Sequence, residues 1–255
     1  MFIDSHCHID FPELADNIDS VWEKMRENQV DRCLCNTVNL EDFPRVLKLA
    51  EAHDNVFATV GVHPDYEDIE EPDVARLVQL ANHPKIIGIG ETGLDYYRLT
   101  GDLEWQRQRF RTHIRAAIKT RKPLIIHTRS AAEDTLKIMR EENAADIGGV
   151  MHCFTETLDI AEQAMAMNFY ISISGIVTFK NAVQIKEVAQ KIPLERLLIE
   201  TDSPYLAPVP FRGKLNQPGY VKHVAEEIAK LRGVSVEEIA QQTTKNFNKL
   251  FNINK

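Results

Sequence analysis

The feature that most constrains the fold is a regular alternation of short apolar runs with longer segments of helical period. Eight runs are rich in β-branched or other apolar residues, and the segments between them repeat apolar residues at i, i+3 and i+4. This order is typical of βα units, in which helices connect parallel strands. The expected strands are Phe2–His6, Val30–Thr37, Val56–Gly61, Ile86–Gly90, Leu124–His127, Gly149–His152, Phe169–Ser174 and Leu197–Thr201.

The number of runs favours a closed (β/α)8 TIM barrel, an α/β fold, over an open doubly wound sheet. The length of 255 residues suits one such barrel, and no low-complexity tract or Gly/Ser linker interrupts the series. We therefore predict a single domain over residues 1–255, with two further helices in Val221–Leu250. Ser130 with Glu133, and Ser235 with Glu238, have the spacing of helix capping boxes.

Composition excludes several classes of protein. A net charge of −8 argues against a broad basic surface that coats nucleic acid, although a local contact with a nucleotide chain remains compatible with it. The chain has no apolar run of about 20 residues and no signal-peptide pattern, so we expect a cytoplasmic protein without a membrane partner. Four cysteines are too few for a disulfide scaffold, and no obligate protein partner is evident.

Metal-capable or acidic side chains stand at the carboxyl ends of five expected strands, where barrel active sites are built. Any one of them alone could be a packed histidine or a helix cap. All six are harder to explain in this way, because the histidines at 53, 83, 113 and 223 lie in or beside helical segments and are assigned to structure. The six candidates are His6, His8, Glu91, His127, His152 and Asp202.

The spacing of His6 and His8 places both rings on one side of a strand, with Cys7 pointing the other way. Four imidazoles and two carboxylates are too many for one tetrahedral site, but they suit two adjacent divalent ions that share a carboxylate and a water. Zinc, manganese and iron all fit this ligand set, and magnesium fits if water completes its shell. Two such ions make a shared water acidic, which indicates metal-assisted hydrolysis with Asp202 as both ligand and proton acceptor.

Other polar and aromatic groups could hold an anionic substrate. Arg129 follows His127 by two residues, which would direct its guanidinium toward the same mouth for bidentate phosphate contact. Further candidate anion contacts are His63, Arg212 and Lys214. Aromatic residues after the strand ends could stack on bases, although packing of loops over the barrel explains each of them equally well. These aromatic residues are Tyr96, Tyr97, Phe154 and Tyr205.

Six short motifs carry a family resemblance. They are Asp4-Ser5-His6-Cys7-His8, Gly61-Val62-His63-Pro64, Gly90-Glu91-Thr92-Gly93-Leu94-Asp95-Tyr96-Tyr97, His127-Thr128-Arg129, His152-Cys153-Phe154 and Glu200-Thr201-Asp202-Ser203-Pro204-Tyr205-Leu206-Ala207-Pro208. With these motifs the chain resembles the TatD family of metal-dependent hydrolases and deoxyribonucleases. The resemblance runs from residue 1 to the last helices, with no departure at a motif position.

The resemblance implies an amidohydrolase-like TIM barrel with two divalent metal ions. By this likeness, one metal is held by His6, His8 and Asp202, a second by His127 and His152, and Glu91 bridges them as a catalytic residue beside Asp202. Glu91 stands where related amidohydrolases often carry a carboxylated lysine.

The resemblance also implies a substrate. The family is reported to hydrolyse DNA phosphodiesters, including by exonucleolytic trimming, so the expected activity is that of a deoxyribonuclease similar to a 3'-5' exonuclease. The expected partner is DNA, as single strands or strand ends. By the same likeness His63 and Arg129 would contact the scissile phosphate, and Asn216 would line the substrate channel.

Two alternatives remain. The same metals could hydrolyse a small amide, ester or phosphoester, because the net charge is acidic and barrels of this kind support many chemistries. A barrel that binds nucleic acid or protein without catalysis is a third hypothesis, and it would require a defective site, whereas every expected ligand is present.

Overall fold

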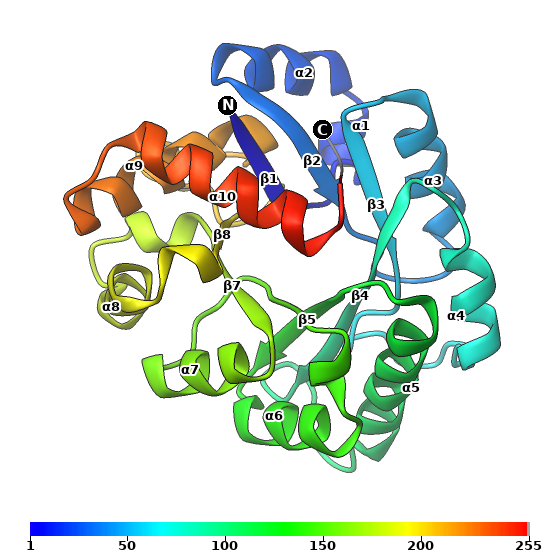
Figure 1. Ribbon diagram of the computed structural model, residues 1–255. Helices are drawn as coiled ribbons and strands as arrows, with labels where there is room; N and C mark the ends of the chain where they lie inside the picture. The colour runs from blue at the N-terminus through cyan, green and yellow to red at the C-terminus, as the bar shows by residue number, and fades with distance from the viewer. Residues whose placement is uncertain (254–255) are drawn as a thin grey trace.

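Eight parallel strands form one sheet that curves into a nearly closed barrel (Figure 1). The computed structural model describes residues 1–253. Each strand pairs with its sequence neighbour in the order β1 to β8, which confirms the predicted single-domain α/β barrel. The strands are β1 (Phe2–Cys7), β2 (Val30–Cys35), β3 (Val56–Val60), β4 (Ile86–Asp95), β5 (Leu124–Arg129), β6 (Gly149–Met151), β7 (Phe169–Ile173) and β8 (Leu197–Ile199).

Helices surround the barrel, and the last one crosses its end (Figure 1). The helices are α1 (Pro12–Ala15), α2 (Ile18–Glu27), α3 (Phe43–Ala52), α4 (Val74–Ala81), α5 (Glu104–Thr120), α6 (Ala132–Glu141), α7 (Leu158–Ala166), α8 (Val183–Lys191), α9 (Val221–Arg232) and α10 (Val236–Leu250). Phe247 of α10 and Phe251 after it pack against strand residues such as Ile3, Leu34 and Leu198. This apolar cluster closes one end of the barrel and leaves the carboxyl ends of the strands for chemistry.

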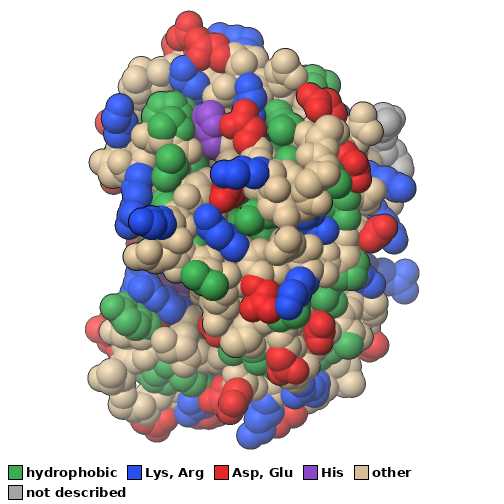
Figure 2. Space-filling model, turned by 90° about the vertical axis from the view of Figure 1, so that its left-hand side faces the viewer, with side chains coloured by type: hydrophobic (Ala, Val, Ile, Leu, Met, Phe, Trp, Pro, Cys, Tyr) green, Lys and Arg blue, Asp and Glu red, His purple; other side chains and the backbone are tan. Residues whose placement is uncertain are grey.

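The strands are largely buried because helices cover one face of the sheet and the barrel interior covers the other. Every residue of β1, β4 except Ile87, β6, β7 and β8 is buried. Most charged side chains lie on the outside, where Figure 2 shows Lys and Arg interspersed with Asp and Glu. No helix within residues 1–253 is long and apolar enough to cross a membrane.

The seam between β1 and β8 closes through backbone hydrogen bonds just beyond β8. The N–H of Asp202 donates to the carbonyl of His6 at 2.9 Å, and the N–H of His8 donates to the carbonyl of Ser203 at 2.8 Å. Two expected ligand segments from opposite ends of the sequence therefore lie side by side because the barrel closes.

The pairing of β4 with β5 is irregular around Glu91. Between Ile89 and Thr92 the pairing with β5 shifts by one residue, as in a β-bulge. Gly90 has φ 149°, and a Cβ there would lie 2.6 Å from the carbonyl oxygen of Ile125. Only glycine fits this position, so Gly90 lets the strand bend immediately before Glu91. The strand then continues to Asp95, five residues past its predicted end.

One predicted helix cap is confirmed and the other is wrong. The hydroxyl of Ser235 accepts the N–H of Glu238 at 3.1 Å at the start of α10. Ser130 instead has φ 55° and lies one residue before the N-cap position of α6, which Ala131 occupies without a side-chain bond. The left-handed turn after Arg129 takes the place of the expected cap. The predicted domain, 1–255, includes residues 254 and 255, which lie outside the described residues.

Candidate metal centre

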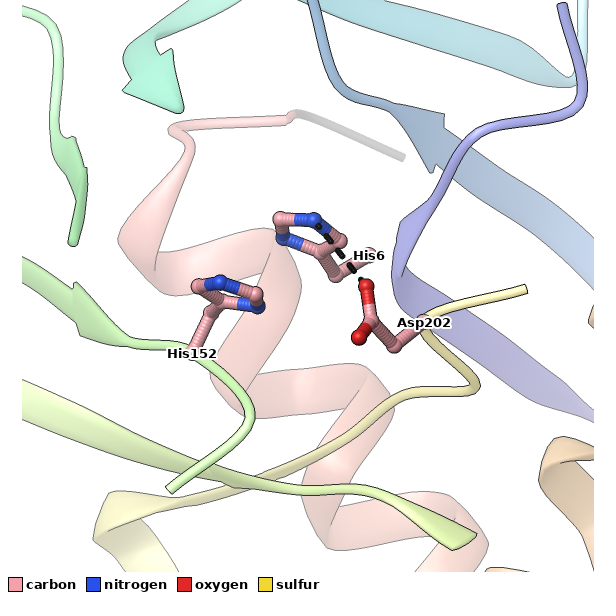
Figure 3. A group of neighbouring side chains, drawn as sticks. All are labelled: His6, His152 and Asp202. Carbon is pink, nitrogen blue, oxygen red and sulfur yellow. Dashed lines mark ion pairs between the residues drawn. The ribbon is translucent and has the colours of Figure 1, made fainter. Parts of the chain in front are cut away.

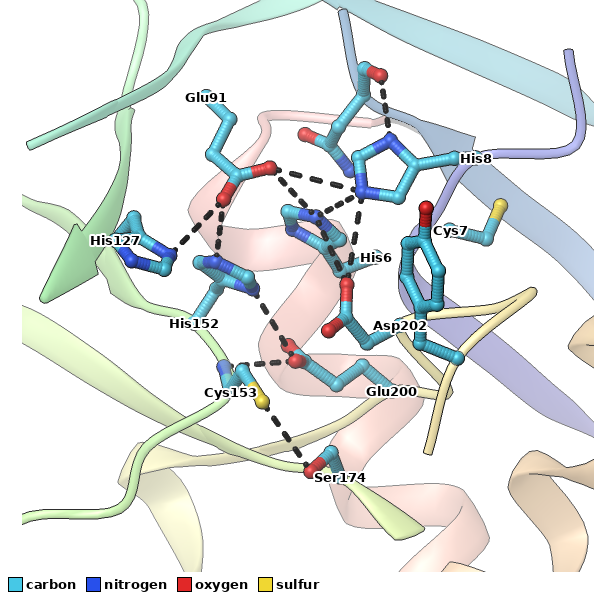
Figure 4. A network of polar contacts seen from close by, with 12 residues as sticks. His6, Cys7, His8, Glu91, His127, His152, Cys153, Ser174, Glu200 and Asp202 are labelled. Carbon is cyan, nitrogen blue, oxygen red and sulfur yellow. Dashed lines mark hydrogen bonds and ion pairs between the residues drawn. The ribbon is translucent and has the colours of Figure 1, made fainter. Parts of the chain in front are cut away.

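The carboxylate of Glu91 lies at the centre of the candidate site, and its two oxygens face different histidines (Figure 4). Glu91 Oε2 lies 3.2 Å from His6 Nε2 and 3.6 Å from His8 Nε2. Glu91 Oε1 lies 2.8 Å from His152 Nε2 and 3.3 Å from His127 Nδ1. One buried carboxylate thus separates the imidazoles into two groups, which is the geometry expected of a bridge between two cations.

Asp202 joins the group on the β1 side. Its Oδ1 lies 3.5 Å from His8 Nε2 and 3.7 Å from His6 Nε2 (Figure 3). The ring of His152 stacks on that of His6, with centroids 3.8 Å apart, so the two groups touch. Three sets of side chains have donor atoms within 4.8 Å of one another: His6, His152 and Asp202; His6, His8 and Glu91; His63, Glu91 and His127.

Two histidines are oriented by buried carboxylates to which the sequence motifs gave no role. His127 Nε2 lies 3.0 Å from Asp95 Oδ2, and His152 Nδ1 lies 3.3 Å from Glu200 Oε1. Each carboxylate can accept the proton of the ring nitrogen that it faces, and the opposite ring nitrogen is directed toward Glu91. Asp95 and Glu200 would therefore orient these imidazoles as ligands once a cation replaces the protons on the Glu91 side.

The sequence carries a signal for one of these carboxylates. Glu200 lies at the end of the expected strand Leu197–Thr201, and a carboxylate in a buried strand needs a hydrogen-bonding partner. Asp95 is 0% exposed and follows Glu91 by four residues on β4. It could not have been identified in this way, because the fourth strand was expected to end at Gly90.

His8 is oriented by the backbone instead. Its Nδ1 lies 3.0 Å from the carbonyl oxygen of Asn36, which accepts the Nδ1 proton and directs Nε2 toward Glu91 and Asp202. His6 Nε2 lies 3.2 Å from His8 Nε2, and His152 Nε2 lies 2.8 Å from Glu91 Oε1. Imidazole nitrogens and carboxylate oxygens that converge in this way are a donor set that fits a bound divalent ion.

His63 has the opposite tautomer. Its Nδ1 accepts the N–H of Asp65 at 3.2 Å, so the neutral ring carries its proton on Nε2. That nitrogen lies 3.2 Å from Glu91 Oε1. His63 thus lies among the metal-capable groups, but its partners present it as a hydrogen-bond donor rather than a ligand.

The charges of the site depend on one another. Burial alone would raise the pKa of the Glu91 carboxyl, but His152, His63 and His6 outweigh it and hold that pKa well below its usual range. Burial alone would lower the pKa of His152, but Glu91 and Glu200 raise it well above its usual value. The centre is therefore a compensated cluster of opposite charges, in which Glu91 is the shared anion.

Helix α5 holds the His63 segment from behind with three buried polar side chains. These residues, at 106, 109 and 113, recur at helical spacing on one face of α5. Gln106 also binds Asp95 through both the N–H, at 2.9 Å, and the carbonyl, at 3.2 Å. The three contacts to residues 62–64 are His113 Nε2 to the Val62 N–H at 3.0 Å, Arg109 Nη1 to the His63 carbonyl at 3.0 Å, and Gln106 Nε2 to the Pro64 carbonyl at 3.1 Å.

A cleft of about 630 Å³ opens over this cluster. His63, Arg129 and Tyr205 line it together with the candidate ligands, and the Arg129 guanidinium lies 4.0 Å from the centre of the Tyr97 ring. Arg212 and Lys214 do not line the cleft. Arg212 lies over the ring of Phe179, and Lys214 lies near the ring of Phe211 in its own loop. Phe154 is 2% exposed and serves packing.

Asn216 is not at the position expected for a residue that lines the channel. It is fully buried, and its Nδ2 donates to the carbonyls of Thr201, at 2.9 Å, and Tyr205, at 2.5 Å. Its Oδ1 accepts the N–H of Gln217 at 2.9 Å. With both ends of its amide occupied by backbone groups, Asn216 organises the loop after β8 and does not face the cleft.

Comparison with known proteins gives this geometry a family. Residues 3–252 match the family model described as TatD related DNase. The uncharacterized metal-dependent hydrolase YcfH of Escherichia coli strain K12 is 47% identical over 254 residues, which cover 98% of this chain and 96% of the relative. The 3'-5' ssDNA/RNA exonuclease TatD of Erwinia tasmaniensis is 33% identical over 248 residues, covering 94% and 96%.

A solved structure supports the same assignment. The crystal structure of YJJV, a TatD homologue from Escherichia coli K12, superposes with a TM-score of 0.90 at 29% identity and covers 99% of this chain and 98% of that one. The eight-stranded barrel, the clustered His, Glu and Asp donors and the match over nearly the whole chain agree. This chain belongs to the TatD family of metal-dependent hydrolases, within the amidohydrolase-like superfamily.

Proposed function

We propose that this protein is a deoxyribonuclease that hydrolyses phosphodiester bonds at the ends of single DNA strands, working as a 3'-5' exonuclease. One observation carries the proposal. The candidate metal ligands, which form the floor of the cleft, lie in the same cleft as two groups suited to bind a phosphate, His63 and Arg129. The name of the Erwinia relative, a 3'-5' ssDNA/RNA exonuclease, supports the same chemistry and polarity.

The proposed metal ligands are His6, His8 and Asp202 for one divalent ion and His127 and His152 for another, with Glu91 between them. Zinc, manganese and magnesium are the candidate ions. When bound, two such ions supply charge stabilisation at the phosphoryl oxygens and acidify the attacking water. The protein contributes the orientation of the imidazole donors, through Asp95, Glu200 and the carbonyl of Asn36.

Asp202 is the proposed proton acceptor. Burial would raise the pKa of its carboxyl, but a hydrogen bond from His8 and the charges of His6 and His152 hold that pKa below its usual range. Its side chain is 17% exposed, compared with 3% for that of Glu91. Asp202 is thus ionised at neutral pH and reaches the cleft, where it can take the proton of water as attack proceeds.

The proposed substrate contacts are His63 and Arg129. His63 Nε2–H is directed toward Glu91 and the cleft, and can donate to a nonbridging phosphate oxygen. Arg129 can bind the same phosphate through two parallel N–H groups, as guanidinium ions do. Both positions explain recognition of a phosphodiester anion by a protein whose net charge is −8.

The test is degradation of a labelled single-stranded oligonucleotide by purified protein with each divalent metal in turn. Wild type should shorten the strand from its 3' end, and Asp202→Asn should lower the rate by about 10² to 10⁴-fold, as expected for loss of a general base. Cleavage at equal rates by wild type and variant would identify a contaminating nuclease and reject the proposal.

A second candidate is hydrolysis of a small amide, ester or phosphoester by the same centre. The cleft volume of about 630 Å³ lies within the range of small-molecule sites, which favours this alternative. A panel of such substrates, assayed beside the oligonucleotide, separates the two. Turnover of a small molecule at far higher kcat/KM than DNA would replace the nuclease proposal.

A further inference from the structure

One wall of the cleft carries two aromatic rings beside the metal-capable floor. The ring of Phe11 stacks on that of His8, with centroids 5.0 Å apart and planes at 18°. Tyr205 meets Phe11 edge to face at 6.4 Å and is 54% exposed. Both rings line the same cleft as Asp202 and Arg129. Two aromatic rings, set nearly at right angles to each other at 75°, therefore begin next to a candidate ligand.

Tyr205 is exposed, but its backbone is tightly held. Its N–H donates to the carbonyl of Asp202 at 3.0 Å, and its carbonyl accepts from Asn216 Nδ2. The N–H of Asn216 in turn donates to the carbonyl of Pro204 at 3.1 Å. An exposed tyrosine on a fixed backbone offers a preorganised contact surface, which lowers the entropy lost on binding.

Three other aromatic residues that follow strand ends are not available in this way. Phe154 is buried, and the hydroxyl of Tyr96 donates to Asp134 at 2.8 Å on the α6 side. The face of Tyr97 is covered by the Arg129 guanidinium. These three rings therefore serve packing or hold polar partners, and none offers a free face at the floor of the cleft.

A further ring, that of Tyr66, also lines the cleft. Tyr66 lies in the loop after β3, and its N–H donates to the carbonyl of His63 at 3.4 Å. It therefore belongs to the segment that carries one of the proposed phosphate contacts. Phe11 and Tyr205 are the pair of contacting rings that continues directly from His8.

We propose that Phe11 and Tyr205 form a stacking subsite for the unpaired base of the terminal nucleotide, and that Asn216 is the positioning residue that fixes Tyr205. The inference rests on the proposed function and names its substrate more closely, as a single-stranded end. A phosphate held between the floor and Arg129 would place its own base over this wall. A base within a duplex is paired and stacked, so its faces are not free to bind there.

The ligand chemistry follows from the two rings. Stacking is tolerant of sequence because every base has a planar π face. A small amide or ester without a ring would have no use for the second aromatic. The subsite thus predicts preference for a terminal base of any identity over an end that lacks one.

The experiment compares two single-stranded oligonucleotides that differ only in the 3' terminal residue, which carries a base in one and is abasic in the other. Metal-loaded wild type should cleave the normal end with a kcat/KM about 5- to 150-fold higher, the value of one base–aromatic stack. Tyr205→Leu and Phe11→Leu should bring this ratio toward one, mostly by raising KM for the normal end, and Tyr205→Phe should retain it.

A matched control comes from the same loop. Leu215 is 49% exposed and does not line the cleft, so Leu215→Ala should leave the ratio unchanged. Asn216→Ala should lower the ratio in the wild-type background but not further in Tyr205→Leu. A merely structural role of Asn216 would lower the rates on both oligonucleotides equally, and the ratio itself is independent of the fraction of folded enzyme.

The outcomes separate this inference from the function on which it rests. If wild type cleaves both oligonucleotides equally well, or if the ratio survives in both leucine variants, the stacking subsite is wrong while the nuclease stands. If wild type cleaves neither oligonucleotide with zinc, manganese or magnesium, the proposed function fails and the subsite with it.

Discussion

The two halves of the metal centre are held by different means. On the β1 and β8 side, His8 is oriented by a backbone carbonyl, and Asp202 is placed by a backbone hydrogen bond to His6 across the barrel seam. On the β4 to β6 side, the buried side chains of Asp95 and Glu200 orient the histidines. In the first half the direct partner of the His8 ring is a backbone group, and buried Asp4 supports the seam through Thr201. In the second half the direct partners of the imidazole rings are themselves buried carboxylates.

This difference predicts different responses to substitution. A carbonyl stays in place whichever side chain its residue carries, so the orientation of His8 should tolerate a change in the side chain of Asn36. A buried carboxylate that is removed leaves its imidazole without an orienting partner. Metal affinity, measured by calorimetric titration of the metal-free protein, reports on both halves, and unfolding by urea reports on the scaffold.

The largest effect is expected at Glu91, which both halves share. Glu91→Gln keeps the shape but removes the charge that faces the four histidines proposed as ligands, so metal binding should weaken by about 10² to 10³-fold, consistent with loss of a buried charge partner. Glu142→Gln is the control, because Glu142 binds Arg111 and Arg115 far from the cleft. Unchanged affinity in Glu91→Gln would contradict the bridging position.

The second effect is on stability against pH and concerns the scaffold behind the β4 side. Burial lowers the pKa of His113 to about 4, from 6.5. Below pH 6.5 the imidazole of His113 binds a proton in the unfolded chain but not in the folded protein. The free energy of unfolding therefore falls as the pH drops from 6.5 toward 4. The loss is about 3 kcal/mol.

Replacing His113 tests this pH dependence. Urea unfolding of metal-free wild type and His113→Gln at pH 7 and pH 4 isolates the contribution, because the histidines of the site titrate in both proteins. The wild type should lose about 3 kcal/mol more than the variant over this range. Equal losses would mean that burial does not hold His113 neutral in the folded protein.

The third effect distinguishes the two halves directly. Asp95→Asn and Glu200→Gln should each weaken metal binding by about 10- to 100-fold, the usual result of removing a partner of a ligating histidine. Asn36→Ala changes the side chain but keeps the carbonyl that orients His8, so its metal affinity should stay within about threefold of wild type. An equal loss in all three variants would remove the distinction between the halves.

The smallest effect concerns α10, which packs against β1 and β8. Ser235→Ala removes the cap of this helix and should cost about 1 kcal/mol in the free energy of unfolding, without a change in metal affinity. Ser130→Ala, the control, removes no helix cap and should cost less than about 0.5 kcal/mol. A drop in metal affinity in Ser235→Ala would show that the β1 and β8 half depends on more than backbone closure.

Much of the architecture could be predicted from sequence because its causes are local. Buried parallel strands are apolar along their whole length, and helices repeat apolar residues at 3.6-residue spacing, so the eight units and their order were predictable. Strand ends were not: β4 runs on to Asp95 through an irregularity at Gly90. The wrong cap at Ser130 has a similar origin, since a left-handed residue depends on how the chain turns after β5.

The six side chains expected at the strand ends lie together around Glu91, because parallel strands in one barrel bring all their carboxyl ends to one rim. The detailed surroundings were less predictable. Asn216 was expected at the channel and lies buried behind Tyr205, and Phe11 lines the cleft although no sequence pattern pointed to it. Which way a loop side chain points depends on partners far away in sequence.

The sequence by itself determined the barrel, the family and the set of metal-capable residues, because periodicity, chemical type and motif spacing are properties of the chain. Only the tertiary structure decided how these residues are arranged in two groups around Glu91. Closure of β8 onto β1 brings Asp202 next to His6 and His8, which are almost 200 residues away in the sequence. The hydrogen-bond partners of each imidazole decide which of its nitrogens carries a proton. Tautomer and orientation depend on contacts between distant segments, which no local pattern records.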